Sequence, residues 1–169
     1  MHRNGVAIVQ AASPSEIEGA RSLLREYIAW AFTQEEDAEN APTFLGIEEE
    51  LANLPGIYAP PAGRLFLATH EGEPAGCICL KPHDSDTCEI KRLYVSPNKR
   101  GLNIGAQMTE RLVEEARQAG YKRIVLDSLM TMTNAHAIYE AVGFKRVPAP
   151  PDVPKHITEI AIFMECDLG

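Results

Sequence analysis

The chain has 169 residues, of which 45% are hydrophobic and 24% charged, the balance of a soluble globular protein that buries one sizeable core. Its formal net charge of −8 disfavours nucleic acid as a partner, because binding to a polyanion relies on Lys and Arg. No apolar run approaches the roughly 20 residues that span a bilayer, and the first residues lack the apolar stretch of a signal peptide. We therefore expect a single domain over residues 1–169, cytoplasmic and without a membrane partner.

The cysteines and histidines give no sign of a metal site. Four cysteines lie mostly inside hydrophobic, strand-like runs, without the spacing of a disulfide framework or a zinc site: Cys77, Cys79, Cys88 and Cys166. We expect core thiols and no bound metal. Three histidines fall in expected loops or on a helix face, where we expect surface positions: His83, His136 and His156.

The N-terminal segment predicts a strand followed by a helix. Residues 6–9 alternate weakly in polarity, as a short strand does. Ser13, Pro14 and Glu16 then combine a capping box with a proline at the first helical position. Apolar residues recur at helical spacing until about Phe32, so this helix should bury one stripe against a core.

The middle of the chain predicts a loop, a short helix and a three-strand meander. Residues 34–40 hold four acids without an apolar period, which is typical of an exposed loop, and residues 43–54 favour a second helix. Prolines and glycines then interrupt regular structure as far as Gly63. Three strands should follow, over residues 64–70, 74–80 and 87–95, the first two joined by a tight turn.

The C-terminal part predicts a helix, a strand, a helix and a closing strand. Residues 104–120 carry the strongest helical spacing, with Gly120 as a natural stop. Residues 123–127 favour a buried strand, and residues 134–142 a short helix. A proline-rich loop then leads to a last strand over residues 157–166. This order of elements predicts an α/β fold of the mixed α+β kind, one sheet with helices on its faces.

Strict alternation along the strand at residues 87–95 would divide its side chains between two faces. Lys91 and Arg92 would then point to opposite faces, so at most one of them could reach a given cleft. One face would carry Glu89, Lys91, Leu93 and Val95, and the other Cys88, Ile90, Arg92 and Tyr94.

The turn after this strand has the properties of an anion site. The strand runs into residues 97–105, which contain Gly101 and Gly105, and a strong helix begins directly after it. A helix start offers unpaired N–H groups and a positive dipole end, and glycines let a phosphate approach the main chain. Four cations gather before or within this turn, namely Lys91, Arg92, Lys99 and Arg100. The alternative is a structural turn whose basic side chains face water.

Three segments resemble the GNAT superfamily of acetyl-CoA-dependent N-acetyltransferases: residues 93–97, 100–105 and 134–144. The family signature is Arg or Gln, two residues, Gly, one residue, then Gly or Ala, which places Arg100 first and Gly105 last. Asn103 stands where glycine is usual and could crowd a pyrophosphate. The resemblance implies a GNAT-like acyl-CoA N-acyltransferase fold, with a central, mostly antiparallel sheet flanked by helices, and acetyl-CoA as cosubstrate.

The resemblance also implies which residues bind the cofactor. The pantetheine arm would pair with main chain where the central strands separate, and the pyrophosphate would meet the amides of the turn. Asn134 would contact the cofactor arm, unless it satisfies only the backbone at its own helix start. The implied cofactor-binding residues are Leu93, Tyr94, Val95, Arg100, Gly101, Leu102, Asn103, Ile104, Gly105 and Asn134.

Two residues are candidates for proton transfer. Tyr139 falls where many GNAT enzymes place a tyrosine near the CoA sulfur, and a phenol can protonate a thiolate, so we assign it as general acid. Its alternative role is aromatic packing. Glu89 lies at a position from which superfamily members often supply the general base, but it could equally pair with Lys91 or face water.

We expect an N-acetyltransferase that acts on a primary amine of a small molecule or peptide. Residues 34–40 and 147–156 should border the acceptor, and the acids of the first segment could attract a cationic amine. A non-catalytic acyl-CoA sensor is the alternative. An NAD-dependent oxidoreductase is less favoured: Asp127 lies at the expected distance for a ribose contact, but the glycine pattern is wrong. A homodimer is compatible with the resemblance.

Overall fold

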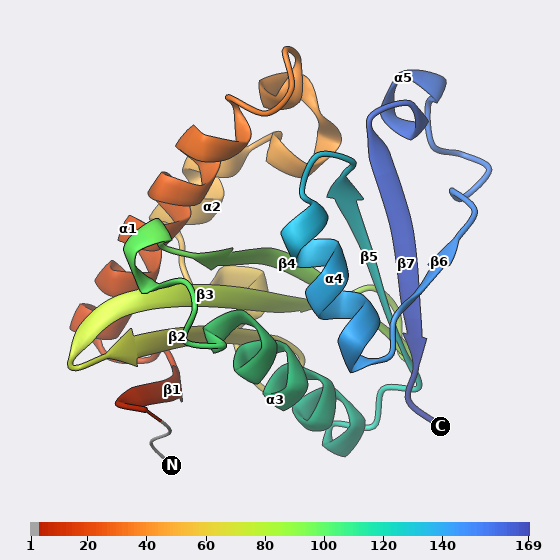
Figure 1. The fold of residues 1–169 in the computed structure, drawn as a ribbon. Helices are drawn as coiled ribbons and strands as arrows, with labels where there is room; N and C mark the ends of the chain where they lie inside the picture. Colours follow the sequence, from red (N-terminus) through yellow and green to blue (C-terminus); the bar gives the residue numbers. More distant parts are fainter. Residues whose placement is uncertain (1–3) are drawn as a thin grey trace.

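The computed structural model describes residues 4–169 and contains one seven-strand sheet (Figure 1). The strands are β1 (Val6–Gln10), β2 (Arg64–His70), β3 (Glu73–Pro82), β4 (Thr87–Val95), β5 (Arg123–Leu129), β6 (Lys145–Val147) and β7 (Ala161–Asp167). Their order across the sheet is β1-β2-β3-β4-β5-β7-β6. Only β4 and β5 are parallel, and every other neighbouring pair is antiparallel. The predicted mixed α/β sheet is confirmed.

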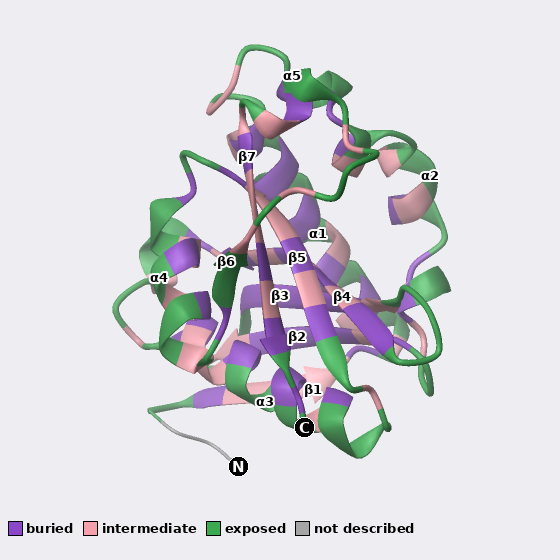
Figure 2. Ribbon diagram, turned by 90° about the vertical axis from the view of Figure 1, so that its right-hand side faces the viewer, coloured by how far each residue is buried: buried purple, intermediate pink, exposed green. Residues whose placement is uncertain are grey.

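Helices cover both faces of the sheet. They are α1 (Pro14–Ala31), α2 (Ile47–Ala52), α3 (Ile104–Gln118), α4 (Thr133–Val142) and α5 (Lys155–Thr158), with 3-10 turns η1 (Ala38–Asn40), η2 (Pro42–Phe44), η3 (Gly56–Tyr58) and η4 (Pro97–Lys99). The buried side chains of α1 and α2 form one core on their face of the sheet, and those of α3 and α4 a second core on the other face. The buried faces of these helices point toward the sheet (Figure 2).

The first helix begins where the sequence predicts. Ser13 Oγ accepts a hydrogen bond from the Glu16 backbone N–H at 3.2 Å, and Glu16 Oε1 accepts one from the Ser13 N–H at 3.0 Å. This capping box satisfies two backbone donors, and Pro14 occupies the first turn, where no donor is needed. The apolar stripe then lies in the core up to Ala31.

The structure contains a strand that the sequence did not predict, β6, and two of the predicted elements have clearly different boundaries. The helix expected over residues 43–54 is divided, because Gly46 adopts a left-handed conformation at φ 73° and separates η2 from α2. The last strand begins at Ala161 rather than Ile157, because residues 155–158 form α5. These short elements lie below the length at which hydrophobic periodicity is informative.

A β-bulge in β4 makes the expected alternation wrong after Lys91. Lys91 lies opposite Cys79 and Tyr94 opposite Cys77, so two residues of β4 face one residue of β3. The extra residue is Arg92, which adopts a positive φ of 65°. A bulge shifts the facing of every later side chain by one position. Tyr94 therefore enters the core beneath α1, whereas Leu93 and Val95 pack against the core of α3.

The parallel strands β4 and β5 pair only over a short stretch. Their register joins Thr87–Glu89 to Arg123–Val125, and neither strand pairs with the other beyond those residues. The edge of β4 from Ile90 onward is thus open on the side of β5. The turn that follows β4 and the start of α4 flank this opening (Figure 1).

Candidate active site

The turn between β4 and α3 presents a row of unpaired backbone donors. Gly101 and Asn103 both adopt left-handed conformations, with φ of 88° and 61°. In the part of the chain that the structure describes, no residue accepts a hydrogen bond from the backbone N–H groups of residues 101–106. These donors stand at the positive end of the α3 dipole. These donors are available to an anion, and the binding of a pyrophosphate here stays a prediction.

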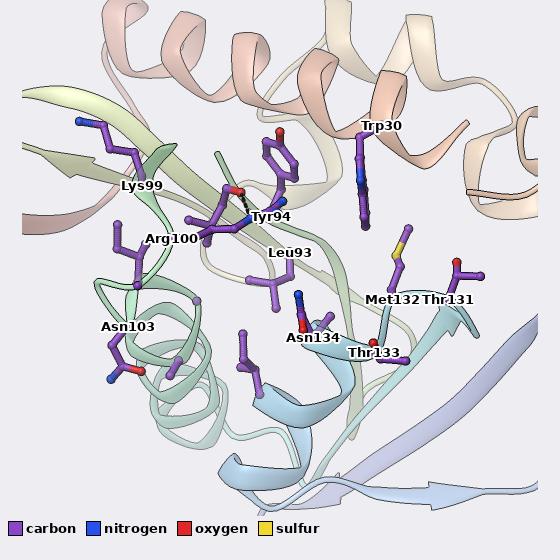
Figure 3. A pocket seen from close by; sticks show the side chains of 17 residues that line it. Trp30, Leu93, Tyr94, Lys99, Arg100, Asn103, Thr131, Met132, Thr133 and Asn134 are labelled. Carbon is purple, nitrogen blue, oxygen red and sulfur yellow. Dashed lines mark hydrogen bonds between the residues drawn. The ribbon is translucent and has the colours of Figure 1, made fainter. Parts of the chain in front are cut away.

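A cavity of about 300 Å³ lies against this turn, and we name it the turn cavity (Figure 3). Nearly all of the residues that the resemblance assigns to cofactor binding line it: Leu93, Tyr94, Val95, Arg100, Gly101, Asn103, Ile104, Gly105 and Asn134. Leu102 does not line it, since its side chain packs against the core of α3. The volume is at the lower end of the range typical of small-molecule sites.

Other residues complete the walls of the turn cavity. Trp30 reaches it from α1 and faces Met132 and Asn134 across the opening (Figure 3). Trp30 was not predicted as a site residue, although it is the one tryptophan of the chain and is only half-buried at the end of an amphipathic helix. Thr131 and Thr133 extend the wall beside α4.

Asn134 and Asn103 are placed differently around the cavity. Asn134 is exposed at the start of α4, and its side chain points into the cavity without a hydrogen bond to any of residues 4–169 (Figure 3). The suggestion that it serves its own helix start is therefore wrong. The Asn103 side chain makes no cap hydrogen bond and leaves the turn on the side away from Asn134 (Figure 3).

The four cations near the turn do not form one cluster, contrary to the sequence expectation. Lys99 Nζ lies 3.3 Å from His70 Nδ1 and 3.5 Å from Glu73 Oε2, which directs its charge toward β2 and β3. Arg100 is exposed, lines the cavity and donates from Nε to the Val95 carbonyl at 3.3 Å. Of the four, only Arg100 has no acidic partner within residues 4–169.

Lys91 and Arg92 point together toward Thr43, so the expectation that they face opposite sides is wrong. Lys91 Nζ donates to Thr43 Oγ1 at 3.0 Å, and the Arg92 guanidinium donates to the Thr43 carbonyl at 2.6 Å. The bulge causes this convergence, because the left-handed Arg92 turns back to the face that Lys91 already occupies.

Arg92 is almost fully buried and fixes η2 to the sheet. Its side chain is 3% exposed and bonds both carboxylate oxygens of Glu50, each at 3.2 Å. Its guanidinium also lies 5.3 Å from the centre of the Phe44 ring. Burial acts to lower the pKa of Arg92, but the hydrogen bonds and charge of Glu50 outweigh it and hold this pKa above its usual value.

A second, smaller space adjoins the turn cavity, and we name it the inner cavity. Its volume is about 70 Å³, and it shares Leu93, Met132 and Ala135 with the turn cavity. Tyr139 lines this inner cavity, with 5% of its surface exposed. Burial, followed by the effects of nearby Tyr27 and Asp127, raises the pKa of Tyr139.

Tyr139 has a packing role beside any chemical one. Its ring lies 5.6 Å from that of Phe144, and both belong to the core of α3 and α4. The packing interpretation of the sequence is therefore confirmed, and the role of Tyr139 as general acid stays a prediction. Tyr139 lines the inner cavity but not the turn cavity.

Glu89 lies further from the turn, in a third space that we name the outer groove. This groove has a volume of about 830 Å³ and adjoins the inner cavity through Thr43, Lys91 and Asp127. Glu89 lines the groove but neither cavity, and its Oε2 lies 3.3 Å from Lys91 Nζ. The proline-rich residues 147–154 form part of the groove wall, whereas residues 34–40 line none of the three spaces.

His136 is buried, not exposed as expected from the sequence. It is 3% exposed, and its Nε2 lies 3.1 Å from the Leu129 carbonyl oxygen and 3.0 Å from Ser128 Oγ. Burial lowers its pKa. All four cysteines are buried free thiols. Within residues 4–169, no group of acidic, histidine and cysteine side chains could hold a metal ion, and no helix has the length and apolarity to cross a membrane.

Comparisons with known proteins agree with this geometry. The model of the acetyltransferase (GNAT) family matches residues 23–144. The chain is 33% identical over 147 residues to an uncharacterized N-acetyltransferase of Schizosaccharomyces pombe, with 86% of each chain covered. It is 29% identical over 108 residues to N-acetylaspartate synthetase of Danio rerio, covering 63% of this chain and 38% of that protein.

A solved structure shows the same fold. PaiA N-acetyltransferase of Thermoplasma acidophilum, in complex with coenzyme A, superposes with a TM-score of 0.74 at 18% identity, over 96% of this chain and 98% of that one. The chain belongs to the acetyltransferase (GNAT) family and is an acetyl-CoA-dependent N-acetyltransferase of that family. The predictions of family, fold and enzyme class are confirmed.

Proposed function

We propose that the protein transfers the acetyl group of acetyl-CoA directly to a primary amine of a small molecule or peptide. The observation that carries the proposal is the order of the three spaces. The turn cavity adjoins the inner cavity, and the inner cavity adjoins the outer groove. A cofactor held at the turn and an acceptor that enters from the groove would meet beside Tyr139.

The chain's own groups suit the cofactor. The unpaired amides of residues 101–106, with Arg100 beside them, would bind the pyrophosphate. The open edge of β4 at residues 93–95 would pair with the pantetheine arm, and the Asn134 amide would contact it. When bound, acetyl-CoA supplies an acetyl carbon activated by its thioester.

Tyr139 is the proposed general acid. Its raised pKa keeps the phenol protonated at neutral pH, so the hydroxyl holds a proton ready for a strong base such as a thiolate. Tyr139 is 5% exposed, so bulk water has little access to its side chain. The same burial that raises the pKa of the phenol would raise that of a thiol beside it.

The first test combines binding and turnover. Melting temperatures are measured with acetyl-CoA, CoA and NAD, because a ligand of the folded state raises the melting temperature. Release of CoA thiol is then followed with aspartate, ethanolamine, spermidine and a short peptide with a free N-terminus. We expect a rise with both CoA species and thiol release with at least one amine. A rise with NAD alone would refute the proposal, and CoA binding without turnover would indicate a sensor.

The matched variant for the acid is Tyr139→Phe, which removes one oxygen from the inner cavity. We expect turnover to fall at least tenfold, with the acetyl-CoA melting shift unchanged. Tyr121→Phe is the control, because the Tyr121 hydroxyl donates to the Ala62 carbonyl at 2.8 Å, away from all three spaces. Equal turnover of the two variants would remove Tyr139 from the mechanism.

A further inference from the structure

The inner cavity is lined by one carboxylate, that of Asp127, which was not predicted as a site residue for acetyl transfer. Asp127 lies on β5, is half-buried and lines both the inner cavity and the outer groove. None of the hydrogen bonds and ion pairs within residues 4–169 uses its side chain. Every other charged side chain that lines the inner cavity has a partner of opposite charge.

The charges around the inner cavity balance except at Asp127. Lys91 is paired with Glu89 at 3.3 Å, and Arg92 with Glu50 at 3.2 Å. The remaining titratable groups that face the cavity are the phenols of Tyr27 from α1 and Tyr139 from α4. A half-buried carboxylate that no cation of the described chain pairs with is free to accept a charge-assisted hydrogen bond from the cation of a ligand.

We propose that Asp127 binds the ammonium group of the acceptor in the inner cavity and removes its proton, in place of Glu89. This inference rests on the proposed acetyl transfer and names the acceptor as a primary amine that enters as its cation. Asp127 and Tyr139 line the same cavity beside the turn cavity, whereas Glu89 lines only the groove beyond it. Glu89 is moreover held by Lys91.

The dimensions limit what enters. At about 70 Å³ the inner cavity holds roughly the volume of two water molecules, which suits an ammonium and its adjoining carbon. The outer groove, at about 830 Å³, has room for the rest of the acceptor. Asp127 lines both, so an ammonium held there keeps its substituent in the groove.

The proton balance follows from the two side chains. The Asp127 carboxylate takes one proton from the ammonium, which frees the nitrogen lone pair to form the new C–N bond as the thioester C–S bond breaks. Tyr139 gives its proton to the departing sulfur and regains one from the acylated nitrogen. Asp127 passes its proton to water in the outer groove, which accounts for the single proton released per turnover.

Direct binding is the first test and needs no turnover. Protein labelled with ¹³C at the aspartate side-chain carboxyl gives one resonance that is missing from Asp127→Asn. We expect ethylammonium chloride to shift this resonance, and equal concentrations of sodium chloride or ethanol to leave it in place. An ethylammonium response that is the same as the sodium response would overturn the proposal.

Steady-state kinetics distinguish Asp127 from Glu89 as the base when each carboxylate is replaced by the corresponding amide. With the fastest amine of the acceptor screen, we expect Asp127→Asn to lower kcat/KM about 100-fold or more and to remove its rise with pH. Glu89→Gln should keep the rise of kcat/KM with pH, and the control is Glu140→Gln, whose exposed carboxylate lines none of the three spaces and whose kcat/KM should stay within about threefold of the natural protein. If Asp127→Asn unfolds, Asp127→Ser replaces it.

The acetyl-CoA melting shift separates the two levels of failure. If the natural protein shows no shift with acetyl-CoA, the proposed function fails. If the shift is present in all proteins and Asp127→Asn keeps its rate and pH dependence, only the assignment of Asp127 is wrong. A large loss in Glu89→Gln with normal kinetics in Asp127→Asn would return the base to Glu89.

Discussion

Removing the charge of Glu50 should expose how much the buried Arg92 contributes to the wall of the active site. The Arg92 side chain is 3% exposed and Glu50 20% exposed, so Glu50→Gln strands a guanidinium that water cannot reach. Removing one partner of a buried ion pair leaves the other charge uncompensated and lowers the free energy of unfolding by about 3–5 kcal/mol. Because the side chain at position 50 is partly exposed to water, we expect Glu50→Gln to lower the free energy of unfolding by about 3 kcal/mol, the lower end of this range.

The reverse change should cost less. Arg92→Met leaves the Glu50 carboxylate near solvent and loses the hydrogen bonds to Thr43, worth about 1–2 kcal/mol in total. The double variant should then be more stable than the sum of the single effects by about 1.5 kcal/mol, as expected for residues in direct contact. Urea denaturation at pH 7, with midpoint and slope fitted together, measures the free energy of unfolding of the two single variants and the double variant.

The same two single variants and the double variant can also be compared for cofactor binding and activity. Neither residue lines the turn cavity, so the acetyl-CoA melting shift should persist in every variant. The kcat/KM for the acceptor should fall in Arg92→Met, because Arg92 holds Thr43 against the inner cavity. Additive single effects, within about 0.5 kcal/mol, would refute the view that Arg92 and Glu50 act as one unit.

Three further predictions concern the turn and α4. A Cβ at Gly105 would lie 2.8 Å from Ile138 Cδ1, so Gly105→Ala should weaken acetyl-CoA binding in calorimetry, and Ile138→Ala in the same chain should restore most of it. Asn103→Gly should leave the dissociation constant for acetyl-CoA within about threefold of the natural value, because the Asn103 side chain points away from Asn134. Asn103→Val should lower the melting temperature, because a β-branched residue is strained at a φ of 61°. His136 has a lowered pKa when folded, so its contribution is present above the unfolded value of about 6.5 and is lost as pH falls below it. The unfolding free energy should therefore drop less between pH 7.5 and 5 in His136→Asn, and an unchanged drop would contradict this.

Most elements followed from local chemistry in the sequence. The capping box at Ser13 and the apolar stripe after it determined α1, and Gly120 marked the end of the helix that begins at the turn. The turn itself could be predicted because its donors are main-chain groups, whose availability depends on position at a helix start more than on distant contacts. Most of the cavity-lining residues of the turn itself were therefore named in advance, but the wall formed by Trp30 and residues 131–133 was not.

The catalytic assignments depended on contacts that no local pattern contains. Asp127 interrupts an apolar strand, which was a signal, but only the separation of β4 from β5 brings it to the same cavity as Tyr139. Glu89 seemed well placed by its strand position, yet its pairing with Lys91 and its place in the groove became visible only in three dimensions.

The family resemblance, most of the order of elements and the glycine turn could be predicted from the sequence, because each depends on short-range periodicity, backbone conformation or a contiguous motif. Which side chains line the inner cavity and the outer groove became visible only in three dimensions. The bulge at Arg92 arises from the register between β3 and β4, and one extra residue reverses the facing of all that follow. That register depends on partners far apart in the chain, so alternation within β4 alone could not reveal it.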